Sequence, residues 1–297
     1  MKKMKNKFLK LSVMFVVVLC TLTTVASSVS AASVVVGAKN FTESQVVSEI
    51  YALALEKEGF KVSRKQSISS SVIPTAIKKG QIDLYPEYTG TALLTILKGK
   101  MTTDPDQAYQ KAKAGLAKQG LTALPYAPGN DGQGIAMRAS VAKKYGIRTI
   151  SDLQRHAEKI RFASQGEFDK RTDGLAGLAK KYGDFKFKSN KVYDNALKYQ
   201  ILSQSKADAT PAYTTEGQLA SKKYVVLKDD KNFWPPYNLM PIVTTKVAKQ
   251  NPKLVKTINQ VDRKLTTKTL IKLNKQVDLD KHSYKSVAKK WYQANFD

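Results

Sequence analysis

Short apolar runs alternate with amphipathic helical segments along most of this 297-residue chain. An apolar run at 34–37 is followed by a segment at 42–58 in which apolar residues recur at helical spacing. Thr42, with Gln45 three residues later, matches a capping box at the start of that helix. The series continues with a strand, a helix and a strand at 60–63, 73–79 and 82–85. Elements in this order, joined by short loops, indicate an α/β fold.

A second series of the same kind occupies the middle of the chain, with expected strands at 134–138, 159–163, 191–193, 207–210 and 224–227. From Ile242 the chain reads as a strand followed by three helices. This order predicts two α/β lobes: lobe 1 comprises residues 32–136 plus 241–297, and lobe 2 comprises 137–240. Ligands of such sheets bind at the carboxyl ends of strands. Lys39 and a loop at 85–91 are expected there.

The first residues read as a targeting segment. Five lysines lie within residues 2–10, an apolar run spans 11–26, and a small-residue stretch at 27–32 offers cleavage after Ala31 or Ala32. The apolar run is shorter than the roughly 18–20 residues that a membrane span needs. We therefore expect residues 1–31 to be a signal peptide and the mature protein to be exported to the cell surface.

Cys20 is the only cysteine and lies inside that segment. The run 17–20 loosely resembles a lipobox, but Leu19 stands where a small residue is expected. Ordinary cleavage is favoured, and a lipid anchor at Cys20 remains the alternative. Either way the mature chain has no thiol, so disulfides, cysteine nucleophiles and thiolate metal sites are excluded.

The chain is strongly basic, with a formal net charge of +26. Cleavage removes five lysines and no acids, which leaves about +21. The lysines are scattered among apolar residues, as on solvated helix faces. In an exported protein this pattern favours peripheral association with an anionic cell envelope, and we expect no nucleic-acid partner.

Motifs of common enzymes are missing from the sequence. There are two histidines, and no nucleophile elbow, Walker loop, dinucleotide-binding glycines or paired-histidine zinc motif. The acidic pair Asp229-Asp230 is more typical of a turn than of a metal site. We expect no catalytic activity, no metal and no cofactor.

Two aromatic stretches carry the functional signal: residues 83–91 (DLYPEYTGT) and 229–237 (DDKNFWPPY). Their tyrosines lie beside proline, glycine and threonine, which favour turns. A quaternary ammonium has no N–H to donate, so an aromatic face is what can select it. The two stretches therefore predict a binding protein for such a cation.

These stretches also resemble those of a known family, as do residues 37–43 (GAKNFTE), Asp173-Gly174 and residues 273–277 (LNKQV). The family is that of the substrate-binding proteins of ABC importers for glycine betaine, carnitine and choline. The resemblance covers essentially the whole mature chain. It implies a two-lobed type II periplasmic-binding-protein fold with a ligand cleft, and a membrane permease and an ATPase as partners. We expect a monomer.

In that family a cage of tyrosines surrounds the trimethylammonium group, and Lys, Arg and Thr hold the carboxylate. The resemblance places Tyr88, Tyr213 and Tyr237 in the cage, and Lys39, Thr91 and Arg171 at the carboxylate. Other interpretations stay open. Tyr237 could merely pack the segment between the lobes, Lys39 could be a solvated charge, and Arg171 could form a surface ion pair with neighbouring acids.

The chain departs from the family pattern at two positions. Gln133 stands where the family usually has a cage tyrosine, and Ser44 where it usually has glutamine. The main prediction is capture of glycine betaine, carnitine or choline for delivery to an ABC permease. Because of Gln133, the alternative is a different polar amine or amino-acid derivative in the same fold. A basic cell-envelope adhesion protein is a further alternative.

Overall fold

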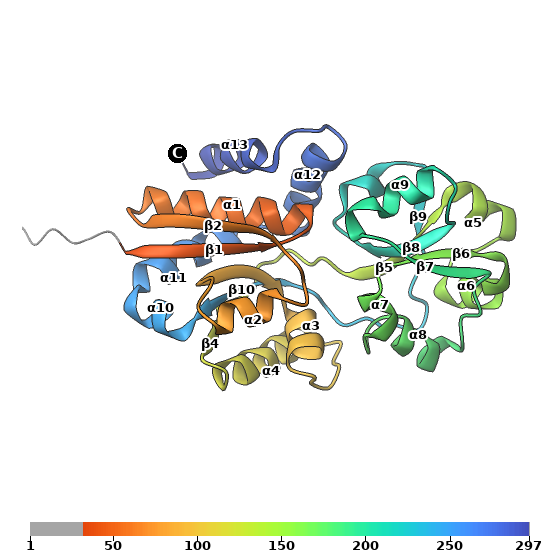
Figure 1. Ribbon diagram of the computed structural model, residues 1–297, viewed down its shortest axis with the longest axis horizontal. Coiled ribbons are helices and arrows are strands. Elements are labelled where there is room, and N and C mark those ends of the chain that lie inside the picture. The colour runs from red at the N-terminus through yellow and green to blue at the C-terminus, as the bar shows by residue number, and fades with distance from the viewer. Residues whose placement is uncertain (1–31, 297) are drawn as a thin grey trace, which may run out of the picture. The chain divides into compact units, whose positions relative to one another are not determined.

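The computed structural model describes residues 32–296. The predicted signal peptide at 1–31 and the alternative anchor at Cys20 lie outside these residues. The described chain builds two five-stranded sheets within one compact unit (Figure 1). Both sheets mix parallel and antiparallel neighbours. Within this part of the chain, no helix combines the length and the apolar character needed to cross a membrane.

The strands of the first sheet are β1 (Ser33–Lys39), β2 (Lys61–Ile68), β3 (Leu84–Tyr88), β4 (Leu121–Ala123) and β10 (Leu239–Thr244). Their order in the sheet is β2-β1-β3-β10-β4. β1 is parallel to β2 and β3, whereas β10 is antiparallel to β3 and β4. The chain therefore completes its first sheet only after it has built the second.

Helices cover both faces of the first sheet (Figure 1). One face carries α1 (Thr42–Lys57), α11 (Pro252–Asp262), α12 (Thr267–Asp278) and α13 (Tyr284–Phe296), with α10 (Thr245–Gln250) leading into α11. The other carries α2 (Ile73–Lys78), α3 (Thr89–Thr91), the π-helical turn η1 (Ala92–Ile96) and α4 (Pro105–Ala117). Val34 and Val36 pack on the first group and Val35 on the second. Burial on both faces explains why β1 begins as a continuous apolar run.

The second sheet contains β5 (Gln133–Arg138), β6 (Arg161–Ser164), β7 (Ser189–Val192), β8 (Ala209–Tyr213) and β9 (Tyr224–Val226), in the order β7-β6-β8-β5-β9. β6 is parallel to β7 and β8, and β5 is antiparallel to β8 and β9. Its helical segments are α5 (Ala139–Tyr145), α6 (Ile150–Arg155), η2 (Ala157–Lys159), α7 (Glu167–Lys170), α8 (Leu175–Tyr182), η3 (Asn195–Leu197), α9 (Lys198–Ser203) and η4 (Gly217–Ala220). The predicted lobe boundary at residue 136 falls inside β5, all of which belongs to this sheet.

Two segments cross between the sheets, one before β5 and one between β9 and β10, and they pair with each other. The Asp131 N–H donates to the Tyr237 carbonyl at 3.0 Å, and the Leu239 N–H donates to the Gly129 carbonyl at 2.9 Å. Asn130 and Asn238 form an antiparallel bridge between these bonds. This pairing fixes Tyr237 beside Asp131, where the chain passes between the sheets.

Two local predictions are wrong. The N-cap of α1 is Phe41 and makes no side-chain cap, while the Thr42 hydroxyl donates to Asp278 Oδ1 on α12 at 2.6 Å. A tertiary hydrogen bond has replaced the expected capping box. The expected loop from Tyr85 is also absent, because β3 continues through Pro86 to Tyr88. Pro86 lies opposite Pro241 of β10. Proline has no backbone N–H, so this pair can face each other only at a position where neither residue donates a hydrogen bond to the other strand.

Candidate ligand-binding site

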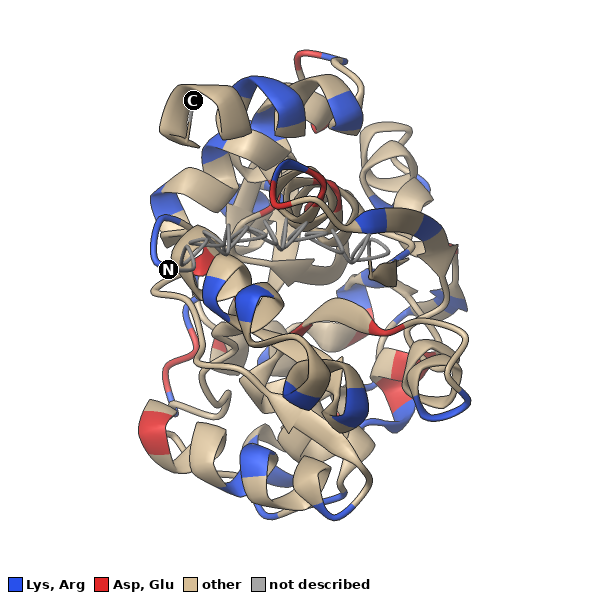
Figure 2. Ribbon diagram, turned by 90° about the vertical axis from the view of Figure 1, so that its left-hand side faces the viewer, with Lys and Arg blue, Asp and Glu red and all other residues tan. Residues whose placement is uncertain are grey.

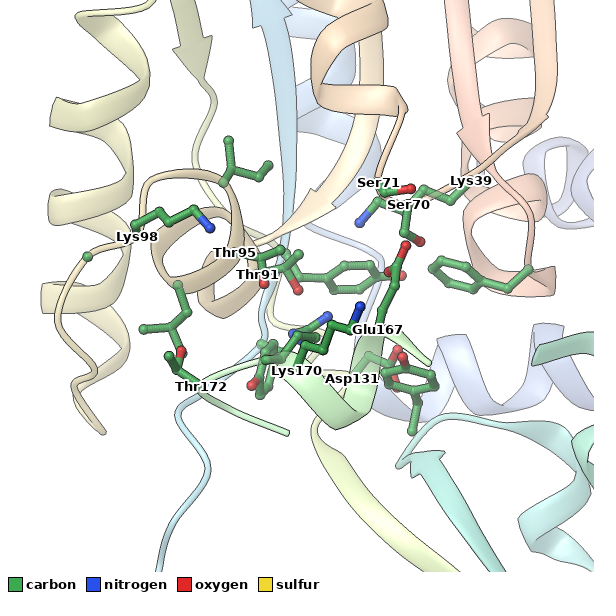
Figure 3. Close-up of a pocket in the computed structure, with 18 residues that line it drawn as sticks. Lys39, Ser70, Ser71, Thr91, Thr95, Lys98, Asp131, Glu167, Lys170 and Thr172 are labelled. Carbon is green, nitrogen blue, oxygen red and sulfur yellow. The ribbon is translucent and has the colours of Figure 1, made fainter. Parts of the chain in front are cut away.

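A cavity of about 400 Å³ is lined by elements of both sheets. Lys39, Tyr88 and Tyr213 are the last residues of β1, β3 and β8, so strand ends deliver side chains to it, as expected for α/β sheets. Figure 3 shows its lining. Six of the seven predicted site residues lie in that lining: Lys39, Tyr88, Thr91, Arg171, Tyr213 and Tyr237. Their role in binding remains a prediction.

The hydroxyls of two cavity tyrosines are bonded to buried acids. The Tyr88 hydroxyl donates to Glu43 Oε1 at 2.8 Å, and the Tyr237 hydroxyl donates to Asp173 Oδ2 at 2.5 Å. Tyr88 is 4% exposed and Tyr237 is 2% exposed. Burial, and then the charges of Glu43 and Asp173 respectively, raise the pKa of each phenol well above its usual range. Both rings therefore stay neutral and are fixed by their hydroxyls.

Phe41 is an aromatic lining residue that the sequence prediction missed. Its ring is nearly parallel to that of Tyr213, at an interplanar angle of 13° and a centroid distance of 6.4 Å. Its centroid is 6.3 Å from that of Tyr88. Phe41 follows the carboxyl end of β1, so the rule that selected Lys39 would have found it too. With Phe41, the cavity has four aromatic lining residues.

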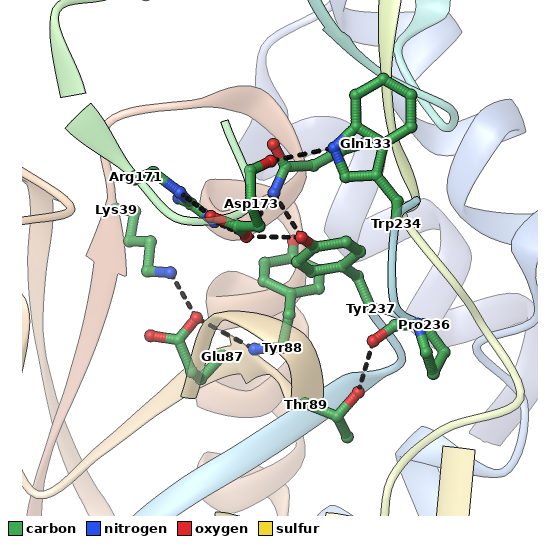
Figure 4. Close-up of polar contacts among 10 residues, drawn as sticks. All are labelled: Lys39, Glu87, Tyr88, Thr89, Gln133, Arg171, Asp173, Trp234, Pro236 and Tyr237. Carbon is green, nitrogen blue, oxygen red and sulfur yellow. Dashed lines mark hydrogen bonds and ion pairs between the residues drawn. The ribbon is translucent and has the colours of Figure 1, made fainter. Parts of the chain in front are cut away.

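Gln133 is the predicted site residue that does not line the cavity. Its side chain is bonded to the protein: Nε2 donates to the Tyr237 hydroxyl at 2.6 Å and to Asp173 Oδ2 at 2.7 Å (Figure 4). Gln133 is 7% exposed. It therefore supports Tyr237 from outside the lining and does not form a wall of the cavity.

The two predicted carboxylate-binding cations are paired inside the protein. Lys39 Nζ forms a buried ion pair with Glu87 and lies 5.4 Å from the centroid of the Tyr88 ring, so Lys39 is not a solvated surface charge. Arg171 holds Asp173 with both branches, Nε to Oδ1 at 2.7 Å and Nη2 to Oδ2 at 2.5 Å. Burial favours the neutral acid, but the hydrogen bond and charge of Arg171 hold the pKa of Asp173 below its ordinary value.

Three threonines and Lys98 lie at one end of the cavity, whereas Lys39, Ser70 and Ser71 lie toward the other. Figure 3 shows Thr91, Thr95, Lys98 and Thr172 on one side, with Asp131 on the other. No ion pair engages Lys98 or Lys170 within residues 32–296. This end of the cavity can therefore offer hydroxyl and ammonium donors to an anion.

Asp131, which the sequence analysis also missed, is a buried acid in the lining. It is 5% exposed, and its Oδ1 accepts bonds from the Thr215 hydroxyl at 2.6 Å and the Thr215 N–H at 3.2 Å. Burial, and then the charge of Glu43, raise the pKa of Asp131 well above its ordinary range. A buried carboxyl is costly to ionise, and a cation bound nearby would stabilise its ionised form. Asp131 is two residues from Gln133, in the stretch that departed from the family pattern.

No group of three or more metal-ligating side chains is close enough to hold a metal ion in the described part of the chain. The geometry is that of a non-covalent binding site. Aromatic faces and a buried acid suit a cation, and the opposite end suits an anion.

The fold and this cavity define the class of protein, a two-sheet α/β solute-binding protein. The chain belongs to the OpuAC family, described as the substrate-binding domain of ABC-type glycine betaine transport systems, whose profile matches residues 32–294. The family prediction is therefore confirmed, and with it the prediction of a binding protein that is not an enzyme.

Individual relatives are also named as solute-binding proteins. The chain is 34% identical over 262 residues to the ergothioneine transport permease/ergothioneine binding protein EgtU of Helicobacter pylori (strain G27), covering 86% of this chain but 46% of that protein. It thus spans about half the length of that relative. It is 31% identical to the glycine-betaine-binding protein of Pseudomonas aeruginosa, covering 85% of each.

A crystal structure of a glycine betaine/carnitine/choline ABC transporter protein superposes with a TM-score of 0.70 at 29% identity, covering 88% of this chain and 98% of that one. The predicted type II periplasmic-binding-protein fold is confirmed. At the level of the family, so is the prediction of a substrate-binding protein for quaternary ammonium osmoprotectants of ABC importers.

Proposed function

We propose that the protein captures a zwitterionic quaternary ammonium solute, a betaine, and delivers it to the permease of an ABC importer. The observation that carries this proposal is the two-ended cavity. Phe41, Tyr88, Tyr213, Tyr237 and Asp131 suit the cation, and the threonine and lysine end suits the carboxylate. A betaine uses both ends, whereas choline leaves the second without an anionic partner.

The expected affinity follows from the aromatic contacts. A desolvated cation–π contact contributes about 2 kcal/mol, so several rings can support a dissociation constant of about 1 µM once ordering costs are deducted. Because elements of both sheets line the cavity, a bound solute favours the conformation in which both contact it. We take this closed form to be the one that the importer recognises.

The cellular setting is part of the proposal. The importer's permease and ATPase are the protein partners, and the mature chain acts as an exported monomer at the cell surface, without nucleic acid. In the view of Figure 2, Lys and Arg are distributed over many elements of the described chain. A dispersed positive charge suits loose contact with an anionic envelope. Family membership supports solute capture over the envelope-adhesion alternative.

Titration calorimetry tests the proposed function. Glycine betaine, carnitine, choline and proline betaine would be titrated into the purified protein, with free amino acids as the control set. We expect micromolar binding of at least one betaine and weaker binding of choline. Heat from the amino acids alone, with none from any quaternary amine, would overturn the proposal.

A second candidate solute is ergothioneine, an amino-acid betaine. The 34% identical relative is named for it, and a cavity of about 400 Å³ has room for a betaine that carries a ring. Competition against a bound betaine ranks the two candidates. Displacement at lower concentration by ergothioneine than by glycine betaine would favour ergothioneine.

A further inference from the structure

A second cavity, of about 360 Å³, adjoins the first. The two cavities share three lining residues: Phe41, Asp131 and Tyr213. The near-parallel rings of Phe41 and Tyr213 therefore stand at the boundary between them. The second is called here the acid-lined cavity, because four carboxyl side chains line it: Glu43, Asp131, Glu216 and Asp278.

The charges around the acid-lined cavity do not balance. Lys198 is the single lysine in its lining, and it is already ion-paired with Glu216. The other three acids accept bonds from neutral groups: Tyr88 and Asn274 donate to Glu43, Thr215 to Asp131, and Thr42 to Asp278. Within residues 32–296, none of these three is in an ion pair. A cation would stabilise the ionised form of these acids, so the cavity favours a positively charged or donor-bearing group over an anion.

Acceptor oxygens remain unused beside this cavity. Both bonds from Thr215 go to Asp131 Oδ1, so Oδ2 of this 5% exposed side chain has no hydrogen bond among the described residues. The Oδ1 atom of Asn274, another lining residue, is also buried without a partner. Burial is the largest factor that raises the pKa of Glu43, Asp131 and Asp278. A ligand that brings donors or positive charge would relieve these costs.

We propose that the acid-lined cavity is a second subsite, which takes a hydrogen-bond-donating or positively charged arm of the solute. The quaternary ammonium lies in the first cavity, and Asp131 faces both groups. In an amino-acid betaine, the ammonium, the carboxylate and the side chain leave one carbon atom in three directions. This matches the aromatic faces, the threonine and lysine end, and the acid-lined cavity. The inference rests on the proposed function and specifies its substrate class as betaines of amino acids with donor-bearing side chains.

Calorimetry at neutral pH with three probes tests the subsite. Glycine betaine has no side chain, histidine betaine carries a donor-bearing ring, and valine betaine carries an apolar side chain as the matched control. We expect histidine betaine to bind at least about ten-fold more tightly than glycine betaine, as for one good hydrogen bond to a charged group. Valine betaine should bind no more tightly than glycine betaine. Equal affinities for histidine and valine betaine would overturn the subsite.

The same titrations separate the two proposals. If glycine betaine binds and histidine betaine gains nothing, the subsite is wrong and the proposed function stands. If no quaternary ammonium compound binds, the proposed function itself fails.

Two aspartates at the end of α12 provide a matched pair of variants. Asp278→Asn removes an ionisable carboxyl from the acid-lined cavity and leaves an oxygen to accept the Thr42 hydroxyl. Asp280→Asn makes the same substitution at an exposed side chain that pairs with Lys275 outside the cavity. We expect Asp278→Asn to reduce the preference for histidine betaine over glycine betaine by about three-fold or more. Asp280→Asn should keep the wild-type preference. An unchanged preference in Asp278→Asn would contradict the subsite, and residual glycine betaine binding shows that the variant is folded.

Discussion

At the scale of single residues, hydrogen bonds to the hydroxyls fix two of the cavity tyrosines, Tyr88 and Tyr237. Tyr237 donates to Asp173 and accepts from Gln133, and Arg171 holds Asp173 in turn (Figure 4). The sequence indicated which residue types matter, through the family resemblance. It could not indicate that Gln133 points at a tyrosine hydroxyl, because that depends on the pairing of two distant crossing segments.

Removing the ring of Tyr237 should therefore cost more affinity than removing its hydroxyl. We expect Tyr237→Ala to weaken betaine binding at least about ten-fold through loss of the cation–π face. Tyr237→Phe should keep most of the affinity but lower the free energy of unfolding by about 1–2 kcal/mol, because Asp173 and Gln133 lose a partner. Calorimetry and urea unfolding measure the two effects. Equal affinity losses in both variants would assign the hydroxyl, and not the ring, to the solute.

Asp131 should make binding depend on pH. Burial raises the pKa of Asp131, so its carboxyl keeps a proton to higher pH than an ordinary carboxyl, while a bound cation favours the ionised form; binding is therefore coupled to proton release. Affinity should therefore rise with pH above the ordinary carboxyl range of about 4. The other groups that face Asp131 are Glu43 and Glu216, together with phenols that stay neutral. Calorimetry from pH 5 to pH 8 measures the slope, which Asp131→Asn should flatten. An unchanged slope in that variant would contradict the role of Asp131.

At the scale of elements, tertiary contacts set two element boundaries that the local sequence did not predict. The order of strands and helices could be predicted because each has a clear apolar period. The start of α1 and the length of β3 could not, because Thr42 bonds to α12 and Pro86 faces Pro241. Both outcomes depend on partners more than 150 residues away in the sequence.

Helix α3 begins close to the Tyr237 ring. A Cβ added to Gly90 would lie 2.7 Å from Cδ1 and Cε1 of that ring and 2.9 Å from the Pro236 carbonyl oxygen. Gly90→Ala should therefore displace Tyr237 and weaken betaine binding, with an overpacking cost of about 1–3 kcal/mol. Calorimetry and thermal unfolding measure the change. Wild-type affinity in a stable variant would show that the ring position does not matter.

Helices α1 and α11 are joined by a buried acid that opposes folding at neutral pH. Asp262 Oδ1 accepts the Tyr51 hydroxyl at 2.6 Å, Oδ2 has no partner, and burial raises the pKa of Asp262 well above its ordinary range. The folded state then binds more protons than the unfolded state, so stability falls as pH rises above about 4.

Asp262→Asn removes this ionisation and keeps an acceptor for Tyr51. We expect the free energy of unfolding to increase by about 1–2 kcal/mol at pH 8, with little gain near pH 4. Urea unfolding at both pH values checks this. Asp262→Ala is the control and should be less stable, because the Tyr51 hydroxyl loses its partner. A lower free energy of unfolding for Asp262→Asn than for the wild type at pH 8 would contradict this prediction.

At the scale of the whole molecule, one cavity gathers residues from both sheets and from the crossing between them. The family resemblance supplied six of its lining residues, but not Phe41 or Asp131, and it supplied Gln133, which lies outside. Phe41 could have been found from the sequence, because it follows the carboxyl end of β1 as Lys39 does. Asp131 could not, because its place in the lining depends on how the crossing segments pair. Aromatic faces and an acid at one end, with free donors at the other, describe a site for a zwitterion with a permanent cation.

The central claim is that the permanent positive charge, and not merely the shape of the trimethyl group, is recognised. Calorimetry comparing glycine betaine with 3,3-dimethylbutanoate tests it most directly, because the second compound replaces the ammonium nitrogen with carbon and keeps both the shape and the carboxylate. We predict that glycine betaine binds at least about 100-fold more tightly, as expected if two or more desolvated cation–π contacts are lost. Equal affinities for the two compounds would contradict the account.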